Sequence, residues 1–223
     1  SAQFTVDNLS SNLTRPVIEG DQGAGGGSTS TGGVTKSGPN RLTLSGTNTY
    51  TGTTTVDGGE IYIDTGASII TDVEVDSGGT LSLDSDSNLS GSVSIAIDGG
   101  TLAARTGFTL TKDISLVSTA TFDVGGSDQL EISGTIGGGG TLRKTGTGTL
   151  YLSVSNSFTG GLIFEEGVVR GEVSSNLGFL APFTFDGGTL NVAGNFTTSR
   201  DVTFASTGSI DVDSGRTLRL TGT

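Results

Sequence analysis

Apolar residues occupy every second position in a series of short segments, and each segment follows a turn rich in glycine or aspartate. Such alternation is typical of strands with one buried face, and the Gly-Gly, Asp-Gly and Ser-Gly pairs are typical of tight turns. The segments are DGGEIYI (57–63), DSGGTLSL (76–83), DGGTLAA (98–104), GGGGTLRK (137–144), DGGTLNV (186–192) and DSGRTLRL (213–220). No stretch of useful length shows the 3.6-residue apolar period of a helix. The pattern predicts a protein built from many short strands.

These segments recur at intervals of about 20 residues, a length typical of repeat proteins. Their leading apolar residues are almost evenly spaced, with one longer step between Leu142 and Val169. The series is Leu42, Ile61, Leu81, Leu102, Phe122, Leu142, Val169, Leu190 and Ile210. A regular period of this size indicates an architecture in which each unit packs on its neighbours along one axis.

Two longer internal matches strengthen this interpretation. Residues 95–135 align with 183–223 without a gap and share 15 of 41 positions, and residues 36–63 align with 144–171, also without a gap. The two offsets, 88 and 108, differ by one repeat interval, so the first half of the chain carries one additional unit. A stack of units tolerates such a change without disturbing its other parts.

We therefore predict an all-β fold, a parallel β-helix (β-solenoid) of about ten coils of about 20 residues, because one unit of this size cannot enclose a core alone. Inward positions form apolar ladders, and serine, threonine and acidic residues face solvent. The predicted core is Leu42, Leu44, Ile61, Ile63, Leu81, Leu83, Leu102, Phe122, Val124, Leu142, Leu150, Leu152, Leu190, Val192, Ile210 and Val212.

The first 35 residues do not follow this ladder. FTVDNL (4–9) has the alternation of a strand, and GDQGAGGGSTSTGG (20–33) is a segment of low complexity. We predict two parts, an N-terminal cap or flexible glycine-rich segment over 1–35 and a parallel β-helix over 36–223.

Composition excludes several classes of protein. The formal net charge of −12 and the lack of a basic stripe argue against binding to nucleic acid. Cysteine, histidine and tryptophan are all absent, which excludes disulfides, thiolate metal sites and cysteine or histidine catalysis. No apolar run is long enough to cross a bilayer as a helix.

The segment SGPNRLTLSGTNTYTGTTTVDGGEIYI (37–63) resembles the passenger-associated transport repeat of bacterial autotransporters. KTGTGTLYLSVSNSFTGGLIFEEGVVRG (144–171) is similar to the same repeat, although Val154 replaces its usual glycine and Phe158 its usual tyrosine. The resemblance implies a right-handed parallel β-helix in a passenger-domain fragment of a type V autotransporter. It also implies export by a C-terminal translocator barrel that lies outside this chain.

Four residues of these segments have an expected structural role. We interpret Tyr50 and Phe158 as packing or corner residues, and Asn48 and Asn156 as turn residues whose amides bond the backbone of the corners. We predict no catalytic, cofactor-binding or metal-binding residue.

Two sharper hypotheses compete with this structural interpretation. Polysaccharide-active enzymes use the same fold, and Asp84 and Asp86 are the carboxylates that alternation places on one outward face, but the chain lacks histidine and tryptophan for such a site.

A calcium-binding function is suggested by the aspartates at glycine-rich turns, which are Asp57, Asp76, Asp98, Asp186 and Asp213. The glycine-rich nonapeptide of calcium-binding solenoids is, however, absent. Turn formation explains these aspartates.

The predicted function is a non-catalytic, surface-exposed stalk of an autotransporter passenger that promotes folding-coupled export and supports adhesion at the surface of a Gram-negative bacterium. An alternative is that the β-helix is itself the adhesin and binds a host surface or another copy of itself. The remaining alternative is a polysaccharide-active enzyme. The predicted partners are the translocator barrel and, for an adhesin, host-surface molecules, with no cofactor, no nucleic acid and no insertion into a membrane.

Overall fold

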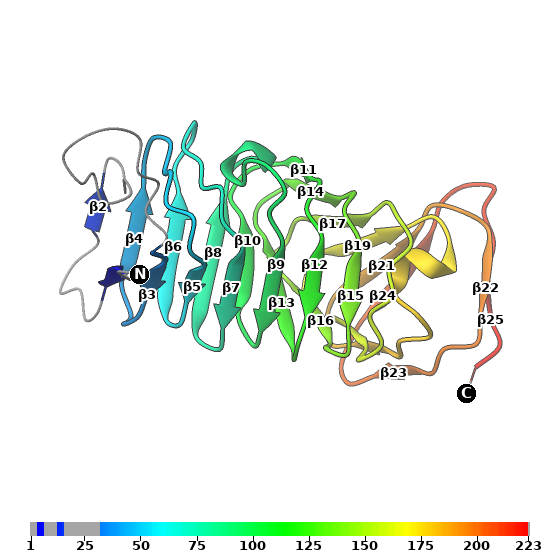
Figure 1. Cartoon of the computed structure of the whole chain (residues 1–223). Helices are drawn as coiled ribbons and strands as arrows, with labels where there is room; N and C mark the ends of the chain where they lie inside the picture. The colour runs from blue at the N-terminus through cyan, green and yellow to red at the C-terminus, as the bar shows by residue number, and fades with distance from the viewer. Residues whose placement is uncertain (1–3, 7–12, 16–31, 223) are drawn as a thin grey trace, which may run out of the picture.

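Short parallel strands wind around one axis and stack into an elongated rod (Figure 1). The computed structural model describes residues 4–6, 13–15 and 32–222, and neighbouring strands in its sheets pair in parallel. This arrangement confirms the predicted all-β parallel β-helix. One sheet has ten strands, one in each coil, so about nine turns separate its first strand from its last.

Three long sheets form the walls of the rod. Sheet A contains β1 (Phe4–Val6), β3 (Val34–Lys36), β5 (Thr54–Val56), β7 (Val73–Asp76), β9 (Ile95–Asp98), β12 (Ile114–Leu116) and β15 (Ile136–Gly138). Sheet B contains β2 (Leu13–Arg15), β4 (Arg41–Leu44), β6 (Gly59–Ile63), β8 (Gly79–Leu83), β10 (Thr101–Ala104), β13 (Ala120–Val124), β16 (Leu142–Thr145), β18 (Leu162–Phe164), β20 (Phe183–Phe185) and β23 (Val202–Phe204). Sheet C contains β11 (Phe108–Leu110), β14 (Gln129–Ile132), β17 (Thr149–Leu152), β19 (Val168–Gly171), β21 (Thr189–Val192) and β24 (Ser209–Val212). A fourth, two-stranded sheet pairs β22 (Phe196–Thr198) with β25 (Leu218–Leu220).

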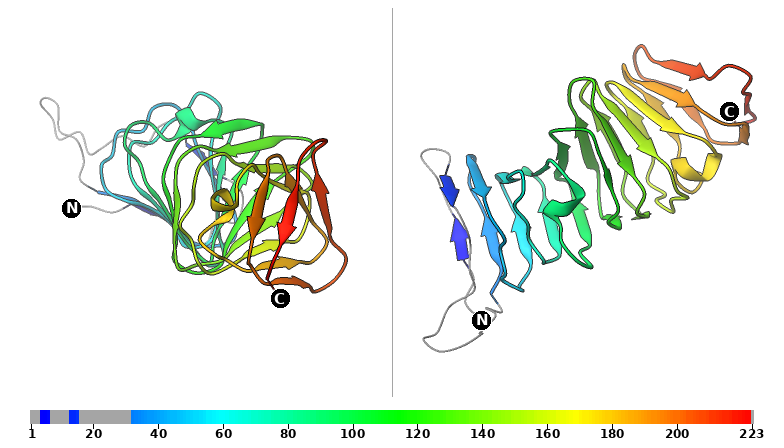
Figure 2. Two further views of the ribbon diagram at one scale, coloured as in Figure 1. Left: turned by 90° about the vertical axis from the view of Figure 1, so that its right-hand side faces the viewer. Right: turned by 90° about the horizontal axis from the view of Figure 1, so that it is seen from above.

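The cross-section of the rod changes along its length. The coils before β11 contribute strands to sheets A and B, sheet C begins with β11, and sheet A ends with β15. Figure 2 shows the later coils displaced to one side of the earlier ones, in the view along the rod and in the view from above. All three sheets run together only in the middle of the chain.

The register of sheet B corrects the predicted ladder. Leu42, Ile61, Leu81, Leu102 and Phe122 pair in order, as predicted. The next residue in register with Phe122, however, is Lys144, whereas Leu142 pairs with Ala120. The predicted continuation through Val169, Leu190 and Ile210 runs in sheet C. The longer step in the sequence is therefore a change of sheet.

The core agrees with the prediction except at the last coil. Fourteen of the sixteen predicted core residues are buried, whereas Ile210 is half-buried and Val212 is 37% exposed. Both lie in β24, the last described strand of sheet C, so a neighbouring coil covers them on one side only. The core also contains a stack of aromatic rings, in which Phe164 and Phe185 lie with centroids 4.4 Å apart.

The sheets begin before residue 36. The strand expected within 4–9 is present as β1, which pairs with β3, and β2 pairs with β4. Most of the glycine-rich segment 20–33 lies outside the described residues, and the division of the chain at residue 35 stays a prediction.

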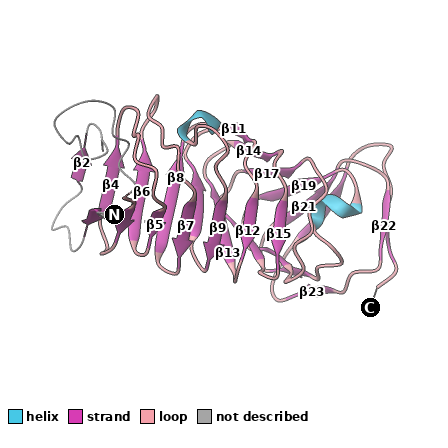
Figure 3. Cartoon of the chain, viewed as in Figure 1, coloured by secondary structure: helices cyan, strands magenta, loops and turns pink. Residues whose placement is uncertain are grey.

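In the described part of the chain, helical structure is limited to two single turns at corners, η1 (Asp86–Asn88) and η2 (Ser174–Leu177), drawn in cyan in Figure 3. Among these described residues, no helix has the length and apolar character needed to span a membrane.

The two internal matches relate different faces of the rod. The first copy of the 36–63 match begins on sheet A with β3, whereas the second begins on sheet B with β16. The 95–135 match behaves in the same way, since β9 in sheet A corresponds to β20 in sheet B. Each second copy is therefore rotated around the axis by one face relative to the first.

Candidate functional site

The two matched segments, 36–63 and 144–171, are the candidate functional site, and in both of them the asparagine of the first corner binds backbone groups. Nδ2 of Asn48 donates to the carbonyls of Gly46 at 3.2 Å and Ser68 at 3.1 Å. Nδ2 of Asn156 donates to Val154 at 3.0 Å and Asn176 at 2.6 Å. One acceptor in each pair lies on the following coil. The amides thus have the predicted role, and they also tie one coil to the next.

Tyr50 and Phe158 are both buried, as expected for packing residues. The hydroxyl of Tyr50 lies 2.7 Å from Oγ1 of Thr54, which lies 2.8 Å from Oγ1 of Thr71. Burial raises the pKa of Tyr50 to about 12, so the phenol stays protonated. Phe158 has no hydroxyl, and Leu162 occupies the position that corresponds to Thr54, so the second copy is apolar at this point.

A pair of buried lysines is the feature of the repeats that sequence reasoning missed. Lys36 and Lys144 occupy the same position in the two copies, and both side chains point into the core. Nζ of Lys36 donates to the carbonyls of Ser37 at 2.6 Å, Gly38 at 2.7 Å and Gly58 at 3.0 Å. We call this set of three carbonyls the lysine cage.

The second copy repeats the lysine cage. Nζ of Lys144 donates to the carbonyls of Thr145 at 2.6 Å, Gly146 at 2.6 Å and Glu166 at 3.4 Å. In both cages the acceptors lie one, two and 22 residues after the lysine. The signal for this feature was present in the sequence, because a lysine begins both copies of the internal match.

Burial has an electrostatic effect on the second lysine. Loss of solvation lowers the pKa of Lys144 to about 8, and the nearby carboxylates of Asp123 and Glu166 partly oppose this change. At neutral pH the group is therefore an ammonium ion that depends on the three carbonyls for its hydrogen bonds.

The carboxylates considered for catalysis serve the corner around η1. Oδ2 of Asp84 accepts hydrogen bonds from Tyr62 at 2.5 Å and Thr65 at 2.8 Å. Oδ1 of Asp86 accepts from the backbone N–H and the hydroxyl of Thr111 at 2.8 and 2.9 Å. The two side chains bind groups on different neighbouring coils, so hydrogen bonds between coils engage both carboxylates.

The aspartates considered for calcium are distributed over several corners. Asp57, Asp76 and Asp98 follow or end strands of sheet A on successive coils, and Asp186 and Asp213 lie at later corners. Oδ1 of Asp213 accepts from Asn191 at 2.8 Å. Within the ranges that the structure describes, no three acidic side chains gather in a way that suits a metal ion.

Stacking of like charges gives a testable effect at Asp76. Burial and the charges of Asp57 and Asp98 raise the pKa of Asp76. A carboxyl with a raised pKa in the folded state destabilises that state above this pKa, and the penalty disappears as the pH falls through it. We expect Asp76→Asn to raise the thermal unfolding midpoint at pH 7 and to have little effect near pH 3. An equal shift at both pH values would contradict this electrostatic origin.

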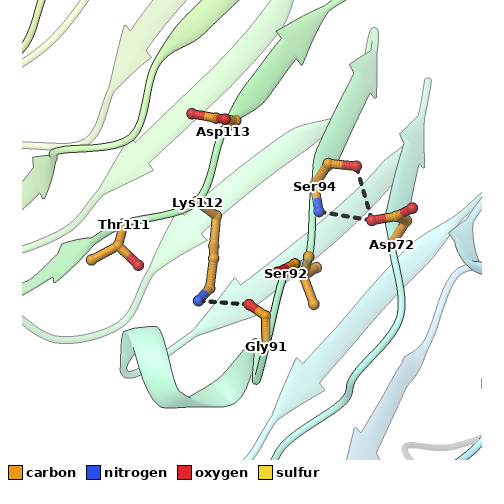
Figure 4. Close-up of a pocket in the computed structure, with 8 residues that line it drawn as sticks. Asp72, Gly91, Ser92, Ser94, Thr111, Lys112 and Asp113 are labelled. Atoms are coloured by element: carbon orange, nitrogen blue, oxygen red, sulfur yellow. Dashed lines mark hydrogen bonds between the residues drawn. The ribbon is translucent and has the colours of Figure 1, made fainter.

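A cleft of about 540 Å³ lies beside the corner residues that directly precede strands β7, β9 and β12 of sheet A (Figure 4). Its lining includes Asp72, Ser94, Lys112 and Asp113. Oδ1 of Asp72 accepts from the N–H and hydroxyl of Ser94 at 2.8 and 2.9 Å, and Oδ1 of Asp113 accepts in the same way from Thr135. These carboxylates therefore join successive coils, as the asparagines do.

Comparison with known proteins identifies both repeats. The family model of the passenger-associated transport repeat matches residues 34–63 and 142–170. The chain is 37% identical over 92 residues to the "Adhesin BmaC autotransporter" of Brucella suis biovar 1 (strain 1330), a match that covers 41% of this chain and 3% of that protein. It is 36% identical over 84 residues to the "Probable autotransporter YfaL" of Escherichia coli (strain K12), which covers 38% of this chain and 7% of that protein. No solved structure gives a significant match.

Proposed function

The chain is part of an autotransporter passenger domain with two passenger-associated transport repeats, and from this premise we propose that it is a non-catalytic stalk whose repeats promote folding-coupled export. The matched relatives are far longer than the chain, which spans 3% and 7% of their lengths. The role of the whole protein, its place at the surface of a Gram-negative bacterium and its dependence on a C-terminal translocator barrel are part of this proposal.

One observation carries the proposal: the lysine and the asparagine that the two repeats share point inward and bind backbone groups of the following coil. Asn48 binds Ser68, Asn156 binds Asn176, and each buried lysine binds a carbonyl 22 residues further along. Residues that serve a receptor lie on the surface, whereas residues that serve folding lie between coils. The repeats therefore have the placement expected of folding units.

Such units provide a direction for export. A coil that emerges from the cell gains strand hydrogen bonds and a buried apolar ladder when it packs on the coil already formed. Because a single coil cannot bury its apolar face, the gain comes stepwise and outside the membrane. This gain opposes backward movement of the chain without a need for ATP.

The core of the second repeat offers a direct test in the full-length protein. Replacing Leu150 and Leu152, both fully buried, with aspartate places two carboxylates in the core. We expect slower surface display and a passenger that is partly cleaved by added protease. The control is Tyr151→Thr, because Tyr151 lies between the two leucines and faces outward, where its hydroxyl binds Glu172 at 2.7 Å. Display at the parental rate in the double variant would contradict a folding role.

Exchange of the repeats separates folding from recognition. Residues 36–63 can replace 144–171 without a change of length. Ala181→Thr then restores the partner that Thr71 provides to the hydroxyls of Tyr50 and Thr54, because the strand register places the buried Ala181 where Thr71 lies in the first copy. We expect near-normal display of this chimera. Normal display of the leucine variant together with loss of display in the chimera would show that the repeat is a specific signal.

A second candidate function is adhesion by the β-helix itself, and an exposed apolar corner favours it. Phe179 and Leu180 are 66% and 61% exposed and adjacent in the chain just after η2, and the exposed Val173 directly precedes η2. Purified protein on beads is the test: aggregation that Phe179→Ser with Leu180→Ser abolishes would support self-association. Beads that stay dispersed would leave the stalk role as the better description.

A further inference from the structure

The two buried lysines interrupt ladders that are otherwise apolar. In sheet B, Lys144 pairs with Phe122 on one side and Phe164 on the other. In sheet A, Lys36 pairs with Val56. Both lysine side chains are fully buried. An apolar residue at either position would extend the ladder, so stability alone does not explain the ammonium groups.

An apolar ladder does not define its own register. Side chains alternate between the two faces of a strand, so a slip by two residues keeps every inward position inward. In this core the inward residues are mostly leucine, isoleucine, valine and phenylalanine, which substitute for one another at a small cost. A coil that packs two residues out of register therefore retains much of its apolar burial.

The lysine cage removes this ambiguity, because it draws its acceptors from two coils. Two of the carbonyls follow the lysine directly, whereas the third belongs to the next coil, at Gly58 for Lys36 and at Glu166 for Lys144. A slip by two residues moves that third carbonyl by about 6.6 Å along the strand, beyond hydrogen-bonding distance. The carbonyl that takes its place lies within a strand and points along the sheet to the neighbouring strand, away from the core. The buried ammonium then lacks one acceptor, and this loss is costly in a core.

We propose that Lys36 and Lys144 determine the register in which the next coil docks on each transport repeat. The inference rests on the proposed folding function and assigns these residues a specific part in it. They act as positioning residues, since each carries a buried charge that is satisfied in one register. A single buried polar group fixes the register of a coiled coil in the same way. The two cages lie on different faces of the rod and share the same spacing of acceptors, so both repeats contain the same device.

Lys144→Met tests the proposal in the isolated chain, because methionine approximates the length of the lysine side chain without its charge. We expect the thermal unfolding midpoint to stay the same or rise, since an apolar residue replaces a buried charge. After dilution from denaturant, the fraction that regains protease resistance falls by roughly half or more, because out-of-register coils are no longer penalised. Lys36→Met has the same effect, and the double variant has a larger one. Arg216→Met, at an exposed corner of the last coil, leaves both quantities unchanged.

Three outcomes would overturn the proposal. A lower midpoint with a normal refolded fraction would show that the lysine only stabilises the fold. Unchanged values of both quantities would show that it has no role in folding. Complete loss of native structure in Lys144→Met and in Lys36→Met would show that the ammonium is required for stability. Because refolding is measured without the cell, these results are independent of the display experiments on the proposed function.

Discussion

Replacing Phe122 with alanine is expected to lower the free energy of unfolding by about 3–5 kcal/mol, the usual cost of removing a large aromatic side chain from a core. Phe122 is fully buried and lies between Leu102 and Lys144 in sheet B. The cavity opens beside Lys144, whose side chain is held by the carbonyls of its cage, so the surrounding coils have little freedom to collapse into it. Denaturant unfolding of the parent and the variant measures the difference.

The neighbouring position provides the control for the predicted direction of the side chains. Asp123 faces outward and is half-buried, and its Oδ1 lies 3.4 Å from Oγ1 of Thr145. We expect Asp123→Ala to change the free energy of unfolding by less than about 1 kcal/mol, as most surface substitutions do. Equal losses at both positions would show that the assignment of inward and outward residues is wrong.

Replacing Gly167 with alanine is the second change with a large expected effect. Gly167 has φ +65°, and a Cβ atom there would lie 2.4 Å from the carbonyl oxygens of both Gly146 and Gly148. The carbonyl of Gly146 is also an acceptor of the lysine cage. The substitution therefore adds steric overlap at the cage to the cost of a left-handed backbone. We expect a loss of about 2–5 kcal/mol in the free energy of unfolding, the sum of roughly 1–2 kcal/mol for the backbone and 1–3 kcal/mol for overpacking.

A second glycine separates these two contributions. Gly66 has φ +79°, and no atom lies within 4 Å of the Cβ that an alanine would add. Gly66→Ala is expected to cost only the backbone contribution, about 1–2 kcal/mol. Gly59, which corresponds to Gly167 in the first repeat, has φ +65°, and a Cβ atom added there would lie 2.4 Å from the carbonyl oxygen of Gly38. Gly59→Ala should therefore behave like Gly167→Ala, and similar losses at Gly66 and Gly167 would contradict a special role for the packed corner.

The fold was predictable because its signals are local and repeated. Alternation along each strand sets which residues face inward, and the regular interval between the segments sets the size of a coil. The change of sheet after β16 was not predictable in this way. Leu142 and Lys144 are both inward residues two positions apart, and alternation does not distinguish which of them pairs with Phe122. In the structure Phe122 pairs with Lys144, whose ammonium group binds carbonyls of the corner that follows the strand.

The lysines show a different limit of sequence reasoning. A lysine is usually a surface residue, and Lys36 and Lys144 each precede a polar turn. Residue type and position in the sequence therefore both predict that these side chains face solvent. Their burial follows from carbonyls that converge only when two coils are stacked. The recurrence of lysine at the same place in both copies was the signal that the sequence offered, but aspartates recur in the same way between 95–135 and 183–223.

The rotation of the second copies by one face has a consequence for the direction in which the rod presents its surface. A duplication or deletion of whole coils changes the length of a stalk, but the coils beyond the change keep the direction in which they face about the long axis. The matched segments here are not separated by a whole number of coils, so each later copy points its equivalent face to another side. A change in length by a fraction of a coil thus turns everything beyond it about the long axis. In a passenger that carries a binding patch further along, such a change would re-aim the patch while leaving its distance from the cell almost unchanged.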